Sequence, residues 1–213
     1  SGKGTAYALF VPPEAYPHYS EKIIALPDSY QVNDRARAID PQVPTRASQG
    51  LPSGAFVFCC FNHHYKITRE VFGLWMELLR QRPASVLWLL VPEGDARRNL
   101  RAAAAAHGVD AQRLVFAGRA PLPQHLARHA CADLFLDTWP YNAHTTASDA
   151  LWAGVPVVTF AGRTFASRVA ASLVHAAGVP ELACDDLEHY ARTVVELAHD
   201  PQRCARLRAT LVA

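Results

Sequence analysis

Long hydrophobic runs are missing from this sequence. The run Val86–Val91, for example, stops at Pro92, whereas a membrane-spanning helix needs about 20 consecutive apolar residues. No signal peptide is visible either. We therefore expect a soluble cytoplasmic protein that has no membrane partner.

Cysteine is sparse and follows no pattern. The five cysteines are Cys59, Cys60, Cys131, Cys184 and Cys204, and they form no CxxC pair and no spacing typical of metal ligands. An odd, scattered set is typical of reduced thiols in a reducing compartment.

Charge of one sign is nowhere in excess. The 21 Lys and Arg residues are scattered and balanced by 19 Asp and Glu residues, which gives a formal net charge of +2. Nucleic-acid-binding domains usually carry a basic patch, so we expect no nucleic-acid partner. Half of the residues are hydrophobic, which suffices for a sizeable core and argues against disorder.

Three segments differ in composition. Residues 1–33 contain a short unit with two possible strands, Tyr7–Val11 and Lys22–Leu26. Residues 34–53 are polar, contain Pro41, Pro44, Gly50 and Pro52 and show no periodicity, which is typical of a linker. Residues 54–213 form the main domain. The chain begins without Met and ends inside a helical pattern, so we expect it to be a portion of a longer protein.

The main domain alternates strands with helices. Apolar runs predict strands at 55–61, 86–91, 113–117, 132–136 and 155–160, and helical periodicity or composition predicts helices at 68–82, 95–107, 123–130, 145–153, 165–177, 186–199 and 201–211. Wholly apolar strands that alternate with amphipathic helices indicate a parallel sheet covered on both faces. We predict a Rossmann-like, doubly wound α/β domain.

The common nucleotide-binding motifs are absent. No GxGxxG follows the first strand and no GxxxxGK[ST] occurs. The loops that follow the strands instead carry groups suited to an anion: His63, His64, Lys66, Arg119, Arg128, His144, Thr145, Thr146 and Arg168. Ligands of such sheets bind beyond the carboxyl ends of the strands. We expect Lys66 to meet the start of the 145–153 helix there and to form a cradle for a diphosphate.

Each residue also has a simpler interpretation. Thr145 and Thr146 are ordinary helix-capping residues, and a single Lys after a strand is usually a solvated charge. His125 and His129 are spaced i, i+4 like a metal pair, yet no Glu follows His125 as in HExxH. Asp149 is suited either to bind a ribose hydroxyl or to face solvent.

Several motifs resemble a known family. They are FNHHYKI at Phe61–Ile67, SVLWLL at Ser85–Leu90, RAPLPQH at Arg119–His125, Asp137-Thr138, NAHTT at Asn142–Thr146, DALWAGVPVVT at Asp149–Thr159 and ASRVAAS at Ala166–Ser172. In order and type they resemble the catalytic region of the O-linked N-acetylglucosamine (O-GlcNAc) transferases, and in particular the bacterial relatives that contain tetratricopeptide (TPR) repeats. The likeness runs from about Tyr19 to the end of the chain.

The resemblance implies the C-terminal half of a GT-B glycosyltransferase, which holds the donor UDP-GlcNAc, preceded in residues 1–33 by the tail of the N-terminal catalytic half. Its implied role for Lys66, beside Tyr65 in a catalytic loop, is to stabilise the leaving UDP. By the same resemblance His144, Thr145 and Thr146 hold the diphosphate, Asp149 the ribose, and the Ala120 backbone with His125 and Arg128 the uracil. A DxD carboxylate pair is absent, which agrees with transfer that needs no metal.

The sequence departs from the family pattern in two ways. His63 stands where the family commonly has Gln, which affects a phosphate contact, and Leu122 stands where Lys is common, which removes a ribose contact. The chain also lacks the family's N-terminal catalytic half and its TPR repeats, which bind the protein acceptor. We therefore expect the chain alone to bind UDP weakly and to transfer no sugar. Three alternatives remain: a transferase that uses UDP-hexose, a non-catalytic nucleotide-binding or scaffold module, and a UDP-sugar epimerase of similar architecture, which the motif match disfavours.

Overall fold

The structure is a computed structural model that describes residues 11, 13–23, 29, 31 and 33–212. The two strands expected at Tyr7–Val11 and Lys22–Leu26 lie for the most part outside these residues. The first described element is a short 3-10 helix, η1 (Pro13–His18).

The main domain is built on one parallel sheet. Its strands are β1 (Phe56–Cys60), β2 (Ser85–Leu90), β3 (Leu114–Ala117), β4 (Leu134–Leu136), β5 (Val157–Phe160) and β6 (Ala183–Cys184). They lie in the order β3-β2-β1-β4-β5-β6, and every neighbouring pair is parallel. The predicted doubly wound parallel sheet is confirmed, and the first five strands fall where the apolar runs predict them. The two-residue edge strand β6 is not predicted by the sequence.

The strands are almost wholly apolar because both faces of the sheet are covered. All five residues of β1 are buried, as are all three of β4, and Trp88 of β2 is fully buried. A strand buried on both faces has no polar face to alternate with. All five cysteines are free and buried, and two of them, Cys59 and Cys60, lie in β1.

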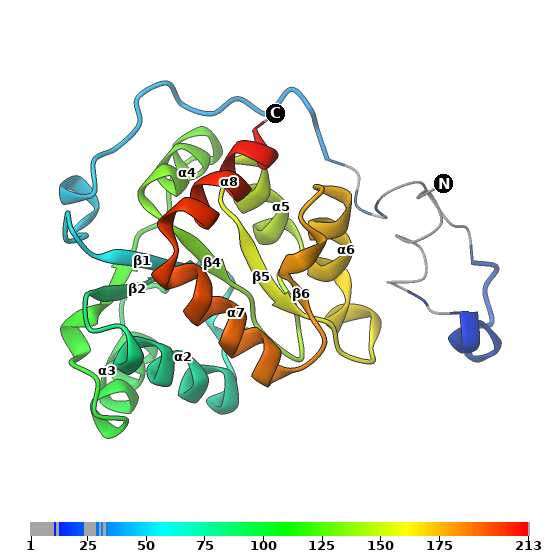
Figure 1. The fold of residues 1–213 in the computed structure, drawn as a ribbon, viewed down its shortest axis with the longest axis horizontal. Helices are drawn as coiled ribbons and strands as arrows, with labels where there is room; N and C mark the ends of the chain where they lie inside the picture. The colour runs from blue at the N-terminus through cyan, green and yellow to red at the C-terminus, as the bar shows by residue number, and fades with distance from the viewer. Residues whose placement is uncertain (1–10, 12, 24–28, 30, 32, 213) are drawn as a thin grey trace.

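Helices cover both faces of the sheet (Figure 1). They are α2 (Arg69–Gln81), α3 (Asp95–Ala106), α4 (Leu122–Arg128), α5 (Thr145–Trp152), α6 (Val169–Ala176), α7 (Leu187–His199) and α8 (Pro201–Leu211). Helix α2 packs against α7, whereas α5 packs against both α4 and α6. The predicted helix positions are confirmed, although 165–177 divides into a 3-10 turn, η6 (Phe165–Ser167), and α6.

The strand order places two loops at the centre of the sheet's rim. The chain runs from β1 through β2 to β3 at one edge and then returns through α4 to β4, on the other side of β1. The winding direction therefore reverses between β1 and β4, and ligands of such sheets bind at this reversal. The loop after β1 leads to η3 (His64–Lys66), and the loop after β4 leads to α5.

The segment before β1 is fastened to the domain. Arg46 donates a 2.8 Å hydrogen bond to the Asp133 carboxylate, and the Asp40 amide donates to the Pro123 carbonyl at 3.1 Å. Figure 1 shows residues 33–50 running past α5 and α4 before they enter β1. A polar, Pro-containing stretch is thus held in place by contacts with residues far away in the sequence.

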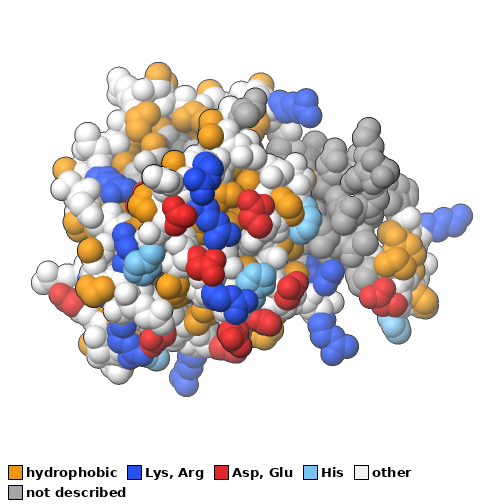
Figure 2. Space-filling view, in the orientation of Figure 1, with side chains coloured by type: hydrophobic (Ala, Val, Ile, Leu, Met, Phe, Trp, Pro, Cys, Tyr) orange, Lys and Arg blue, Asp and Glu red, His pale blue; other side chains and the backbone are white. Residues whose placement is uncertain are grey.

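The outer face of α7 and α8 carries charges of both signs. Figure 2 shows basic and acidic side chains side by side there, and Arg203 pairs with Glu196 at 3.0 Å. Within the described residues, no helix is both long and apolar enough to cross a membrane.

Candidate functional site

Lys66 reaches across the rim to the loop that precedes α5. Its Nζ donates a 2.8 Å hydrogen bond to the carbonyl oxygen of Asn142 and lies 3.7 Å from the centre of the Tyr141 ring. Burial lowers the pKa of the half-buried Lys66 ammonium, while Asp137 and Cys60 act in the opposite direction. The structure therefore brings Lys66 beside the start of α5, as the strand positions predict.

The start of α5 has no threonine cap. The helix begins at Thr145, with His144 in the N-cap position, and the His144 side chain makes no capping hydrogen bond. Thr146 donates its hydroxyl to Asn62 Oδ1 instead, and Thr145 is exposed. The interpretation of the two threonines as caps is wrong. The first N–H groups of a helix have no partner within it, and those of α5 lie at the rim next to Lys66.

A buried carboxylate supports this loop from below. Asp137 is 3% exposed and accepts hydrogen bonds from the amides of Thr138 (2.7 Å) and Ala143 (2.6 Å) and from the Thr159 hydroxyl (2.7 Å). Burial raises the pKa of Asp137 to about 7, against the effect of these donors and of Lys66. Sequence reasoning assigned Asp137 no role, although a single carboxylate directly after a buried strand marks it.

Three further polar side chains brace the same loop. Asn62 donates to the Thr138 hydroxyl at 2.8 Å, and that hydroxyl donates to the Tyr141 carbonyl at 2.7 Å. Asn142 donates to the Thr138 carbonyl at 2.9 Å and is fully buried. Because these hydrogen bonds join the loop after β1 to the loop after β4, the position of Asn142, and with it that of Lys66, is set by residues of both loops.

The residues just before Lys66 form an exposed aromatic edge at the rim. The His63 ring lies 4.5 Å from His64 and 4.6 Å from Tyr65, centre to centre. Tyr65 is 64% exposed. Burial lowers the pKa of His64, and the neighbouring His63 adds to the effect. His63 and Tyr65 are thus open to a ligand on the side of the sheet where Lys66 lies.

Two of the residues expected to bind uracil, His125 and Arg128, lie together on α4, and Ala120 lies just before the helix. Arg128 is 5% exposed and donates to the Gly118 carbonyl at 2.7 Å and, through Nε, to His125 Nδ1 at 3.0 Å. Burial, with smaller effects of His129 and Arg128, lowers the pKa of His125 to about 3. His125 is therefore a neutral imidazole whose Nδ1 accepts, which leaves Nε2 as the donor.

His129 belongs to the core and not to a metal pair. It is fully buried, and its Nδ1 lies 2.8 Å from the His125 carbonyl oxygen. Its ring meets the Phe61 ring edge-on at 5.0 Å, and burial lowers its pKa to about 4. Among the residues that the structure describes, no three His, Cys, Asp or Glu side chains converge to hold a metal ion.

Asp149 is neither exposed nor open. It is 5% exposed, and its carboxylate lies 2.5 Å from Arg37 Nη1. The interpretation that Asp149 faces solvent is therefore wrong.

Two other candidates lie apart from the Lys66 contact: Arg119 is exposed after β3, and Arg168 donates to the Gly162 carbonyl at 2.8 Å.

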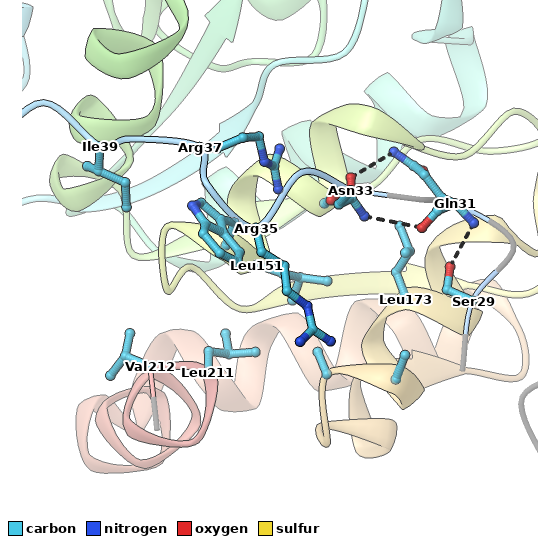
Figure 3. Close-up of a pocket in the computed structure, with 14 residues that line it drawn as sticks. Ser29, Gln31, Asn33, Arg35, Arg37, Ile39, Leu151, Leu173, Leu211 and Val212 are labelled. Atoms are coloured by element: carbon cyan, nitrogen blue, oxygen red, sulfur yellow. Dashed lines mark hydrogen bonds between the residues drawn. The ribbon is translucent and has the colours of Figure 1, made fainter. Parts of the chain in front are cut away.

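Two hollows lie beside the segment that precedes β1. The smaller, of about 200 Å³, is lined by Ala120 and Arg128 together with Asp40, Gln42, Pro44, Gln49 and Gln124. The other, of about 870 Å³, lies between residues 29, 31 and 33–39 and helices α5, α6 and α8 (Figure 3). Trp152, Leu173 and Leu211 contribute to its apolar wall. None of the predicted site residues lines this larger hollow. Ala120 and Arg128, two of the three residues expected to bind uracil, line the smaller one.

The fold with this rim is the Rossmann-like C-terminal half of a GT-B glycosyltransferase. Residues 37–213 match the model of glycosyl transferase family 41, and the chain belongs to that family. The solved structure of an O-GlcNAc transferase mutant from Thermobaculum terrenum is similar, with a TM-score of 0.81 and 31% identity over 95% of this chain and 38% of that one.

Sequence relatives give the same family. The probable UDP-N-acetylglucosamine–peptide N-acetylglucosaminyltransferase SEC of Arabidopsis thaliana is 39% identical over 96% of this chain. The corresponding enzyme of Caenorhabditis elegans is 39% identical over 78% of it. The chain spans 22% and 14% of the lengths of these two relatives.

Proposed function

We propose that this chain is the donor-binding part of a protein O-glycosyltransferase that transfers N-acetylglucosamine from UDP-GlcNAc to Ser or Thr residues. The observation that carries the proposal is the meeting of Lys66 Nζ with the Asn142 carbonyl, 2.8 Å apart, at the opening of α5. A cation and a helix N-terminus converge there without a side-chain cap from His144. Such an arrangement suits a diphosphate.

Lys66 is the proposed catalytic group at the phosphates. As the bond between the sugar and the diphosphate breaks, negative charge grows on the leaving UDP, and a preorganised cation stabilises the transition state more than the ground state. His144, Thr145 and Thr146 hold the diphosphate at the start of α5. His63 adds a contact where relatives of the family commonly have Gln, and Tyr65 lines the approach to Lys66.

The nucleoside lies towards α4 in this proposal. The Ala120 backbone, His125 and Arg128 recognise the uracil, a role that suits a neutral His125 with one donor and a guanidinium fixed by Gly118. Asp149 binds the ribose, for which it must exchange its pairing with Arg37 for a hydroxyl. Leu122, 46% exposed, offers the ribose no charge.

In this proposal Lys66 and the N-terminus of α5 stabilise the negative charge of the diphosphate without a metal ion. Electrostatic stabilisation needs positive charge placed where negative charge develops, and a lysine with backbone N–H groups supplies it. Transfer that persists unchanged in excess chelator is the expected result, and restoration of activity by a divalent cation alone contradicts it.

The acceptor requires more than this chain. We propose that it acts in a cytoplasmic bacterial protein next to an N-terminal catalytic half and TPR repeats that present the acceptor. The chain alone then binds UDP weakly and transfers no sugar. Robust glycosylation of a peptide by the isolated chain contradicts this division of labour.

Calorimetric titration of the chain with UDP tests the proposal. Saturable binding that weakens in Thr146→Val, and by no more than about tenfold in Lys66→Ala, supports it, and no detectable heat at millimolar UDP favours the alternative of a scaffold module. Competition between UDP-GlcNAc and UDP-glucose tests the sugar. Equal or tighter binding of UDP-glucose favours the hexose alternative, for which Leu122 and His63 are the departures of interest.

A further inference from the structure

Tyr141 lies directly over the ammonium of Lys66. It belongs to the loop between β4 and α5 and is 40% exposed. Lys66 Nζ is 3.7 Å from the centre of its ring, well inside the ~6 Å over which a cation is attracted to an aromatic face. The ring of Tyr141 is also 5.2 Å from the ring of His144, so it borders the start of α5.

The two contacts of Lys66 come from consecutive residues. The ammonium has three N–H donors, of which one points to the Asn142 carbonyl while Tyr141 covers it from another side. A lysine side chain is long and flexible, and holding it in one position costs rotamer entropy. A carbonyl and a ring face that are fixed by the same braced loop reduce this cost before any ligand arrives.

We propose that Tyr141 is a positioning residue for Lys66: its ring face holds the ammonium against the Asn142 carbonyl, with the remaining donors directed to an anion at the start of α5. The contact itself does not depend on the proposed transferase activity, whereas its consequence for turnover rests on that function. The attraction is to the ring, so Phe preserves it and Leu removes it.

The lysine content of the chain permits a direct test of the contact. The sequence has only three lysines, Lys3, Lys22 and Lys66, so protein labelled selectively with ¹³C-lysine gives three sets of ε-methylene signals, and a Lys66→Met variant assigns one. We expect the Lys66 protons to be shifted upfield by the ring current in the wild type and in Tyr141→Phe. The shift should disappear in Tyr141→Leu and persist in the matched control Tyr16→Leu, at a tyrosine that is 41% exposed on η1. Lys66 signals without such a shift in the wild type overturn the proposal.

Kinetics of the full-length protein test the consequence. With UDP-GlcNAc and a peptide acceptor, Tyr141→Leu should lower kcat about tenfold, with KM for the donor within about twofold. Tyr141→Phe and Tyr16→Leu should stay within about twofold of the wild type. Equal losses in Leu and Phe variants, or a change in KM alone, contradict the positioning role. An inactive wild type with the NMR shift intact counts against the transferase function and not against the contact.

Discussion

Arg37 and Asp149 form a nearly buried ion pair between the segment before β1 and helix α5. The side chains are 10% and 7% exposed, and the guanidinium also lies 5.2 Å from the centre of the Trp152 ring. The two residues are 112 positions apart in the sequence. The pair therefore ties the segment ahead of the sheet to the helix that opens the candidate site.

Removal of Arg37 should destabilise the protein. Arg37→Ala leaves a buried carboxylate without its partner, and such losses cost about 3 kcal/mol or more. We expect a fall of this size in the free energy of unfolding by urea at pH 7. Arg35→Ala, at an exposed arginine two residues earlier, is the control and should change it by less than about 0.5 kcal/mol. Similar small effects of both changes contradict a structural role for the pair.

Asp137 should make stability depend on pH in an unusual direction. Burial raises its pKa in the folded protein from 3.8 to about 7, so the folded state binds its proton more tightly than the unfolded state does. Its contribution to the free energy of unfolding is therefore fully present below about pH 4. This contribution, on the order of 4 kcal/mol in total, is lost as the pH rises to 7. We expect the difference in unfolding free energy between wild type and Asp137→Asn to fall over this range. A difference independent of pH contradicts the raised pKa.

His129 should act with the opposite sign. Burial lowers its pKa from 6.5 to about 4, so its contribution is present above pH 6.5 and is lost as the pH falls to 4, on the order of 3 kcal/mol. His129→Phe replaces it with a ring that cannot be charged, and we expect the variant to lose less stability in acid than the wild type. His199→Phe, on the exposed end of α7, is the control. If the unfolding free energies of the wild type and His129→Phe fall in parallel as the pH is lowered, the lowered pKa of His129 is contradicted.

Lys66 should matter more for turnover than for binding. In the full-length protein we expect Lys66→Ala to lower kcat by a hundredfold or more, on the order of the loss of one donor to a developing charge. The affinity for UDP, measured by calorimetry, should fall by about tenfold at most, because the ammonium acts chiefly on charge that develops in the transition state. The control is Lys22→Ala, at an exposed lysine. Equal losses of turnover and affinity count against this role.

Local sequence patterns predict most of this fold. The apolar runs of β1 and β2 and the periodicity of α2 are enough to place them, because a strand buried on both faces and an amphipathic helix each leave a clear pattern. The two residues of β6 carry no such pattern, since an edge pairing this short is decided by the neighbouring β5. Figure 1 shows it at the margin of the sheet.

The candidate site is predictable only in part. The position of Lys66 at the same rim as the start of α5 follows from the predicted parallel sheet, whose strands all end at one edge, and the structure agrees. The ion pair of Asp149 with Arg37 cannot be predicted from the sequence, because Arg37 lies in a stretch that has linker composition. The support that Asp137 gives to Thr138 and Ala143 is equally hidden, since it depends on backbone amides, which every residue possesses.

The braced loop between β4 and α5 has a mechanical consequence. Lys66 and the first turn of α5 extend from neighbouring strands of one sheet and are joined by the network of Asn62 and Thr138. If the proposed N-terminal catalytic half moves over this rim, a diphosphate bound here therefore keeps its distances to Lys66 and to the first turn of α5. Only the groups that arrive from the opposite wall would change their distance to it.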